Sequence, residues 1–217
     1  MIDFHAHILP DLDDGSDSVE TSLAMLRESG RQGVKMICAT PHFYAQEDDP
    51  ASFLERRASA WEALKAVLDV SDAYPEIRLG AEVLYFPGMS VADELRTMTL
   101  EGTPFLLIEP PMMPWRETML DEIQECGENL HCVPVIAHVD RYMRMLGDDT
   151  LLDRVYSRRM LAQVNASFFL RESTRERAMK LLGSNRFQFV GSDCHDMQER
   201  RPNLGDAAEI IYSSGGE

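Results

Sequence analysis

Short apolar runs recur along the chain and predict buried strands. Each run is nearly continuous rather than alternating with polar residues, as expected of strands that are covered on both faces of a sheet. Runs of this length favour strands, because helices are usually longer. The seven predicted strands are residues 2–4, 34–39, 77–81, 105–108, 133–137, 162–164 and 187–190.

Most segments between these runs have the periodicity of helices. In 18–30, Leu23 and Leu26 share one face, and the serines within 16–18 are candidate N-caps. In 51–70, apolar residues again recur at helical spacing. Further helices are predicted at about 90–97, 116–127, 148–160, 172–183 and 205–212.

Strands that alternate with helices indicate a parallel α/β fold. A closed or nearly closed barrel is favoured over an open doubly wound sheet, because no glycine-rich dinucleotide or P-loop fingerprint follows a strand. No internal repeat, low-complexity tract or long linker interrupts the alternation. We therefore predict a single domain over residues 1–212 and a flexible tail at 213–217.

Ligand-type side chains cluster where the predicted strands end. Five of the six histidines follow a strand, and three acidic residues do the same. In α/β barrels these strand ends converge on one face, so residues distant in sequence meet there. Buried carboxylates are costly without cations, so the pattern predicts a metal cluster. The residues placed in this way are His5, His7, His42, Glu82, Glu109, His138, Asp193 and His195.

Two further residues of ligand type are not placed by a strand end. Asp14, in the loop after the first strand, is a candidate ligand on weaker grounds. His131 precedes the fifth strand and is predicted to be structural. The His5-x-His7 spacing aims both imidazoles the same way on an extended segment, since side chains alternate with period two.

The charge and composition narrow the range of partners. The 217 residues carry a formal net charge of −16, which repels nucleic acid and anionic lipid. No apolar run approaches the roughly 20 residues that span a membrane, and the first residues lack the features of a signal peptide. A cytoplasmic location is therefore expected.

None of the four cysteines forms a C-x-x-C pair, and disulfides are not expected in the cytoplasm.

Short blocks around the candidate ligands form a recognisable set. They are Ile2-Asp3-Phe4-His5-Ala6-His7-Ile8-Leu9-Pro10, Asp13-Asp14-Gly15, Ala39-Thr40-Pro41-His42, Gly80-Ala81-Glu82, Leu107-Ile108-Glu109, Val135-Ile136-Ala137-His138-Val139-Asp140-Arg141-Tyr142, Ser192-Asp193-Cys194-His195 and Arg201-Pro202. In this order they resemble the polymerase-and-histidinol-phosphatase (PHP) domains. More narrowly, they resemble the bacterial manganese-dependent protein-tyrosine phosphatases of capsule and exopolysaccharide systems. The resemblance runs from residue 2 to about 212.

The resemblance implies a fold, a ligand set and an activity. The fold is a distorted seven-stranded (β/α) barrel, in agreement with the seven apolar runs. The ligands are the eight strand-end residues and Asp14, holding two or three ions. Manganese is implied, although imidazole and carboxylate ligands without thiolate also suit iron, zinc or cobalt. The implied reaction is hydrolysis of phosphotyrosine by a metal-bound hydroxide. The implied substrate is a phosphotyrosine protein, the tail of a bacterial tyrosine kinase, with a role in capsule or exopolysaccharide synthesis.

Arg141 and Arg201 are the candidate catalytic residues outside the ligand set. They follow His138 and His195 in loops on the predicted face, and guanidinium forks match phosphate geometry. In the resembling family both positions bind phosphate. The alternative for each arginine is a surface ion pair with a nearby carboxylate.

Three other functions stay open. A small-molecule phosphatase could act on a sugar phosphate or on histidinol phosphate with the same scaffold. An amidohydrolase-like enzyme would cleave C–N bonds, and the two arginines speak against it. A non-enzymatic module would keep its metals only for folding. Structural metal sites are usually closed by four ligands, whereas nine candidate ligands for three ions leave positions open.

Overall fold

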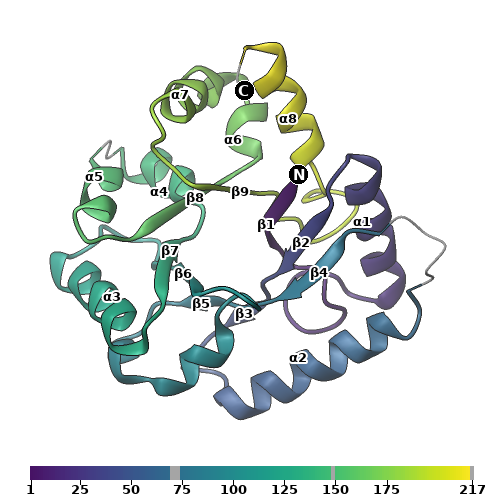
Figure 1. Cartoon of the computed structure of the whole chain (residues 1–217), viewed down its shortest axis with the longest axis horizontal. Helices are drawn as coiled ribbons and strands as arrows, with labels where there is room; N and C mark the ends of the chain where they lie inside the picture. The colour runs from purple at the N-terminus through teal and green to yellow at the C-terminus, as the bar shows by residue number, and fades with distance from the viewer. Residues whose placement is uncertain (69–73, 148–149, 216–217) are drawn as a thin grey trace.

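The computed structural model describes residues 1–68, 74–147 and 150–215, and its strands alternate with helices (Figure 1). The strands are β1 (Ile2–Ala6), β2 (Met36–Ala39), β3 (His42–Phe43), β4 (Glu76–Leu79), β5 (Glu82–Leu84), β6 (Phe105–Glu109), β7 (Val133–Ile136), β8 (Leu161–Asn165) and β9 (Phe189–Gly191). The α-helices are α1 (Val19–Arg31), α2 (Pro50–Lys65), α3 (Glu117–Leu130), α4 (Val139–Leu146), α5 (Leu151–Tyr156), α6 (Ser167–Leu170), α7 (Glu172–Gly183) and α8 (Leu204–Ser213). Two 3-10 helices are η1 (Met89–Val91) and η2 (Asp93–Met98).

The strands form two parallel sheets that curl into a ring, with helices on the outside (Figure 1). The first sheet has the order β1-β2-β4, and the second has the order β3-β5-β6-β7-β8-β9. Every strand pair is parallel. The predicted parallel α/β fold is therefore confirmed as a curled sheet, whose strands all point their carboxyl ends toward one face.

The predicted count of seven strands is not confirmed. Each predicted run overlaps an observed strand, but β3 and β5 are additional, so the described residues form nine strands. The pairs β2–β4 and β3–β5 are separated only by a short break, across which Glu82 N donates to Pro41 O at 2.9 Å. Proline has no N–H for a strand ladder, and its position explains why the first of these strands is interrupted.

Backbone hydrogen bonds join the two ends of the chain beside the candidate ligands. His7 N donates to Cys194 O at 2.9 Å, and Asp193 N donates to His5 O at 2.8 Å. Ala6 and Cys194 form an isolated parallel bridge. The segment after β9 is thus held against β1, and histidines and carboxylates from both ends of the sequence become neighbours.

An apolar floor lies below the polar end of the ring. The rings of Phe4 and Phe189 stack at 3.9 Å between centroids, and Phe105 packs edge-on against both. Along β6 the period-two alternation places Phe105, Leu107 and Glu109 on one face. The same face of one strand therefore supplies the floor and then a candidate ligand above it.

The helix predictions are met in most places. Ser18 caps α1 by accepting a hydrogen bond from Thr21 N, as its position in the sequence predicts. The helix expected at 90–97 is instead the two 3-10 helices, and α4 and α6 were not predicted. Residues 69–70 and 148–149 of two predicted helices lie outside the described residues.

The C-terminal residues only partly match the predicted tail. Of the predicted tail, Ser213 still belongs to α8, and residues 216–217 are not described. In the described ranges, no helix combines the length and the apolar character that a bilayer crossing needs.

Candidate metal centre

The carboxylate of Glu82 lies at the centre of four imidazoles. Its Oε2 is 3.1 Å from His5 Nε2, 3.4 Å from His7 Nε2 and 3.2 Å from His42 Nδ1, and its Oε1 is 2.9 Å from His138 Nε2. Burial opposes ionisation of this side chain, but the adjacent His5 and the hydrogen bond from His138 hold the pKa of Glu82 well below its usual value. A buried, ionised carboxylate among these imidazoles would suit a ligand of a divalent cation.

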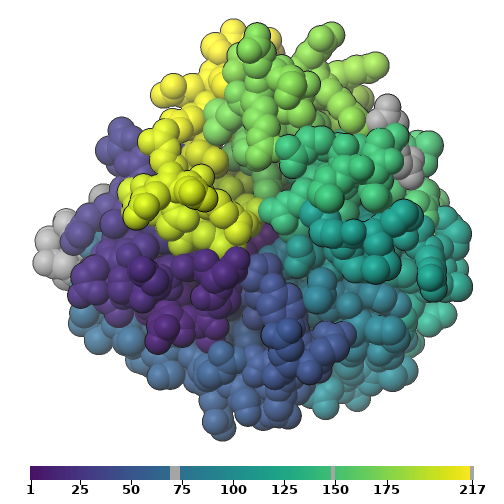
Figure 2. Space-filling view, turned by 180° about the vertical axis from the view of Figure 1, so that it is seen from behind, coloured from purple at the N-terminus to yellow at the C-terminus, as the bar shows by residue number. Residues whose placement is uncertain are grey.

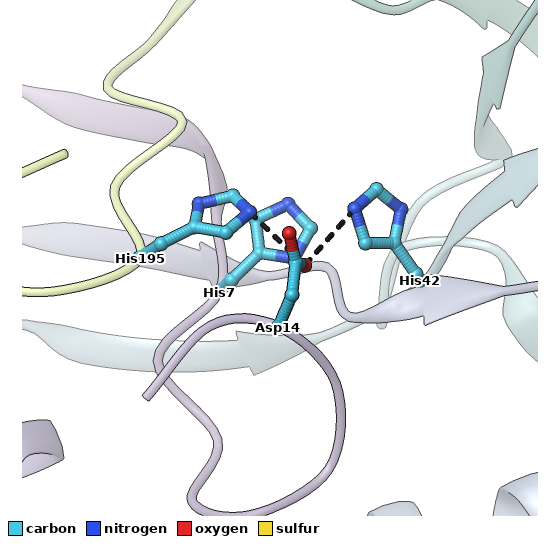
Figure 3. A group of neighbouring side chains, drawn as sticks. All are labelled: His7, Asp14, His42 and His195. Carbon is cyan, nitrogen blue, oxygen red and sulfur yellow. Dashed lines mark ion pairs between the residues drawn. The ribbon is translucent and has the colours of Figure 1, made fainter. Parts of the chain in front are cut away.

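A second group of side chains, His7, Asp14, His42 and His195, points toward a common centre (Figure 3). Each of the four offers a ligand atom, and these atoms lie within 4.8 Å of one another. Asp14 Oδ1 is 3.4 Å from both His42 Nε2 and His195 Nε2. Asp14 is 64% exposed, so it approaches the buried imidazoles from the open side.

The remaining candidate ligands border the same space. Glu109 Oε1 is 3.4 Å from His138 Nε2, and Asp193 Oδ1 is 3.7 Å from the Nε2 atoms of His5 and His7. The structure thus brings together all nine residues that the sequence analysis proposed as ligands. Their assignment as metal ligands stays a prediction, which the chemistry of the donor atoms supports.

The hydrogen bonds of two histidines give the clearest reason to expect a cation. His7 Nδ1 donates to Asp13 Oδ2 at 2.7 Å, and His5 Nδ1 lies 3.3 Å from Gln163 Oε1. These partners are acceptors, so each neutral ring carries its proton on Nδ1 and leaves a lone pair on Nε2. The two Nε2 atoms lie 3.0 Å apart. Facing lone pairs repel unless a cation or a proton lies between them, so this donor set fits divalent metal ions.

In the metal-free protein, protons on the histidine rings would balance the negative charge of the neighbouring carboxylates. Burial favours the neutral ring of His7, but its hydrogen bonds to Asp13 and Glu82 outweigh this and raise its pKa to about 10. For His138, burial is again outweighed, here by Glu109 and Glu82, and its pKa rises to about 9. Metal binding must therefore displace protons from these rings.

Backbone conformation at the site is strained. His138 has φ 29° and Asp193 has φ 54°, in a region that residues other than glycine rarely adopt. Each such residue costs on the order of 1–3 kcal/mol, and such strain is concentrated at functional sites. Close packing adds a further constraint, because a Cβ on Gly191 would lie 2.5 Å from His5 Cβ. Only glycine allows the last strand to approach the first ligand this closely.

One of the two predicted arginines reaches the site, and its expected companion does not. Arg141 Nη2 is 2.7 Å from Asp193 Oδ2. Arg201 is 60% exposed and its Nη2 lies 3.5 Å from Asp206 Oδ2, as in the surface ion-pair alternative. Arg200 instead occupies the other side of Asp193, with Nη2 at 2.7 Å from Oδ1.

The fold of the loop explains why Arg200 rather than Arg201 lies at the site. The backbone N–H groups of His195 and Asp196 both point to the carbonyl of Arg200. The loop turns back on itself there, so Arg200 faces the ligands. Arg201 is left beside Asp206, which lies in the first turn of α8.

Sequence reasoning missed the residues that support the ligands. Asp13 orients His7, Gln163 Oε1 accepts a hydrogen bond from His138 N at 2.6 Å, and Asn165 Nδ2 donates to Asp193 Oδ2 at 2.8 Å. A signal was present for Gln163 and Asn165, because they are polar residues within or next to an apolar run. Asp13 was overlooked beside Asp14, and nothing local distinguishes the two carboxylates.

Comparison with known proteins covers the whole chain. The profile of a family described as "Capsular polysaccharide synthesis, CpsB/CapC" matches residues 1–217. The tyrosine-protein phosphatase CpsB of Streptococcus agalactiae is 30% identical over 230 residues, which cover 100% of this chain and 92% of that protein. The tyrosine-protein phosphatase YwqE of Bacillus subtilis is 27% identical over 225 residues, with coverage of 100% and 85%.

Solved structures give a matching result. The structure described as that of YwqE from Bacillus subtilis and CpsB from Streptococcus pneumoniae, "unique metal-dependent tyrosine phosphatases", has a TM-score of 0.83 at 25% identity. The match covers 100% of this chain and 88% of the solved chain. A putative histidinol phosphatase from Listeria monocytogenes has a TM-score of 0.53 at 15% identity, covering 91% and 96%, and is similar in fold alone.

Proposed function

The chain belongs to the CpsB/CapC family of capsular polysaccharide synthesis, and on this basis we propose that it is a metal-dependent protein-tyrosine phosphatase. Membership confirms the resemblance predicted from the sequence blocks. The names of the relatives support the substrate class. The observation that carries the proposal for this chain is the pair of bare Nε2 atoms of His5 and His7, 3.0 Å apart and facing the Glu82 carboxylate.

The proposed ligands divide into three overlapping groups. His7, Asp14, His42 and His195 form the open group; His5, His7 and Asp193 form the buried group; and His42, Glu82 and Glu109 form the third. His138 adds its Nε2 between the two glutamates. Bound divalent ions would supply a Lewis acid that makes water nucleophilic near neutral pH and neutralises phosphoryl oxygens.

The protein's own residues would bind and orient the phosphoryl group. Arg141 and Arg200 present guanidinium groups on either side of Asp193, one to each carboxylate oxygen. Their remaining N–H donors match the fork geometry of phosphate oxygens. Charge that develops on those oxygens during hydrolysis would be stabilised by donors that are already in place.

We extend the proposal to the finer expectations from the sequence. These are manganese as the native metal, two or three ions, and a PHP-type seven-stranded barrel in which β2–β3 and β4–β5 each count as one interrupted strand. The proposed substrate is the phosphorylated tail of a bacterial tyrosine kinase, and the proposed location is the cytoplasm. The proposed role is regulation of capsule or exopolysaccharide synthesis.

One experiment tests the proposed function against a small-molecule phosphatase. The protein is stripped with EDTA, reloaded with manganese and assayed on a phosphotyrosine peptide beside a panel of sugar phosphates and histidinol phosphate. We expect no turnover after stripping, recovery with manganese, and kcat/KM highest for the peptide. Full activity without metal would refute metal dependence. Preference for a compound of the panel would assign the site to small-molecule hydrolysis.

A further inference from the structure

A cavity of about 130 Å³ opens beside the candidate metal centre on the other side of Asp193. Four arginines line it, together with small polar side chains. Arg141 and Arg144 come from α4, where residues three apart lie on the same face. Arg171 lies between α6 and α7, and Arg200 precedes α8. Segments from the beginning, middle and end of the chain meet on the face of the molecule seen in Figure 2.

The four arginines differ in their partners. Arg141 and Arg200 each pair with Asp193. Arg144 and Arg171 are exposed, and the structure gives their guanidinium groups no ion pair with any described residue. Arginines elsewhere on the surface are often paired, as Arg31 is with Glu28. In a chain with a net charge of −16, two arginines without an ion pair among residues 1–68, 74–147 and 150–215 concentrate positive charge at one cavity, where a substrate would approach.

Nearby carboxylates compensate this charge only in part. Asp140 lines the cavity but is buried, and its Oδ1 accepts a hydrogen bond from Asn165 N at 2.9 Å. Glu199 lines the cavity and is exposed. Asp193 is already shared between Arg141, Arg200 and the imidazoles of the centre. The cavity therefore has an excess of guanidinium groups over carboxylates that could pair with them.

We propose that Arg144 and Arg171 form an outer anion site that binds an acidic side chain of the substrate next to the phosphotyrosine. The inference rests on the proposed phosphatase function and adds the sequence class of its substrate. Asp193 belongs both to the candidate ligands and to the lining of the cavity, so a peptide whose phosphate lies at the centre would extend over these arginines. A carboxylate there would meet donors suited to bidentate pairing. The enzyme then selects phosphotyrosine segments rich in Asp and Glu.

The test compares two phosphotyrosine peptides that differ at one flanking position, Glu in one and Gln in the other. For the wild-type protein loaded with manganese, we expect kcat/KM to favour the Glu peptide by roughly 2- to 5-fold, the range of exposed charged contacts. Raising the salt concentration should reduce the preference. The ratio of the two rates cancels any effect on catalysis that both peptides share.

Arginine variants assign the preference to the cavity. R144Q and R171Q should each reduce the ratio, and the double variant should bring it to about one. The matched control is R159Q, an exposed arginine that precedes β8 at the opposite end of the ring. It should keep the wild-type ratio. If R171Q fails to fold, as judged by circular dichroism, R171K keeps the charge and should keep a measurable preference.

The outcomes separate this inference from the function on which it rests. A wild-type ratio of one, or a ratio that the double variant leaves unchanged, would overturn the outer site while phosphotyrosine hydrolysis stands. Absence of phosphotyrosine hydrolysis in the metal-loaded wild type would refute the proposed function and the outer site with it. A third peptide carries a second phosphotyrosine at the flanking position. If it were preferred over the Glu peptide and lost that preference in the same variants, the ligand would be a phosphate rather than a carboxylate.

Discussion

Replacing Arg200 by alanine should slow hydrolysis strongly without removing the metal. Arg200 Nη2 is 2.7 Å from Asp193 Oδ1 and its side chain is 38% exposed, so it is held in place at the edge of the centre. Removal of one preorganised donor to a charged transition state costs about 10²- to 10³-fold in rate. Metal content should be retained, because losing a positive neighbour leaves Asp193 a stronger attractor of cations.

The neighbouring arginine provides the matched control. Arg201 is 60% exposed and its nearest acidic partner is Asp206 at 3.5 Å, the geometry of a surface pair worth about 0–1 kcal/mol. R201A should therefore stay within about twofold of the wild-type rate. R141A should resemble R200A, since Arg141 is 28% exposed and pairs with the other oxygen of Asp193.

Three measurements on each variant check this reasoning. These are kcat/KM for p-nitrophenyl phosphate, kcat/KM for a phosphotyrosine peptide, and metal content by elemental analysis. A normal rate in R200A would refute its contact with the phosphoryl group. A loss in R201A as large as that expected for R200A would support the sequence prediction for Arg201 and contradict the surface role inferred from its position.

Three further predictions concern the ligands and their neighbours. Without metal, the raised pKa values of His7 and His138 stabilise the protein fully below pH about 6.5, and this stabilisation should be lost as pH rises to about 10. Melting temperature measured in EDTA should fall across that window, and an unchanged value would refute the assignment of protons to these rings. E82Q should lower metal affinity at least roughly tenfold, because it removes the central negative charge among four imidazoles; full occupancy by elemental analysis would contradict that role. C194S should keep most of the activity, because Cys194 is fully buried and burial raises the pKa of its thiol; loss of turnover in folded, metal-loaded C194S, with a phosphocysteine trapped at Cys194 of the wild type, would overturn this expectation.

Much of the candidate site was predictable because parallel strands place the residues that follow them on one face. Each apolar run marks a strand, all strands point the same way, and the residue that follows each run must emerge on one face. His42, Glu82 and His138 could be placed in this way with no knowledge of which strand lies beside which. The same rule predicted the gathering of Asp193 and His195 with His5, although nearly the whole chain separates them.

Features that depend on side-chain direction within loops were not predictable. Arg200 and Arg201 are adjacent and chemically identical, and only the folding of the loop onto the Arg200 carbonyl decides which one faces the ligands. Asp13 and Asp14 pose the same problem, since one orients His7 and the other faces His42 and His195. Part of the difference in strand count arises at Pro41, which separates β2 from β3 without ending the pairing beyond it.

The residues that hydrogen-bond to the candidate ligands explain how the site can keep its shape when its charge changes. Gln163 uses its Oε1 for His138 N and its Nε2 for Val164 O, so its amide orientation is defined by the backbone. Asp13 likewise accepts from His42 N at 2.9 Å and Gly15 N at 3.0 Å as well as from His7. Because Asp13 also accepts from His7 Nδ1 and Gln163 Oε1 lies 3.3 Å from His5 Nδ1, these two supports tie the imidazoles of His5 and His7 to the main chain. Exchange of one divalent metal for another should therefore disturb the site less than loss of either support, because a bound ion would balance the charge while these residues set the positions.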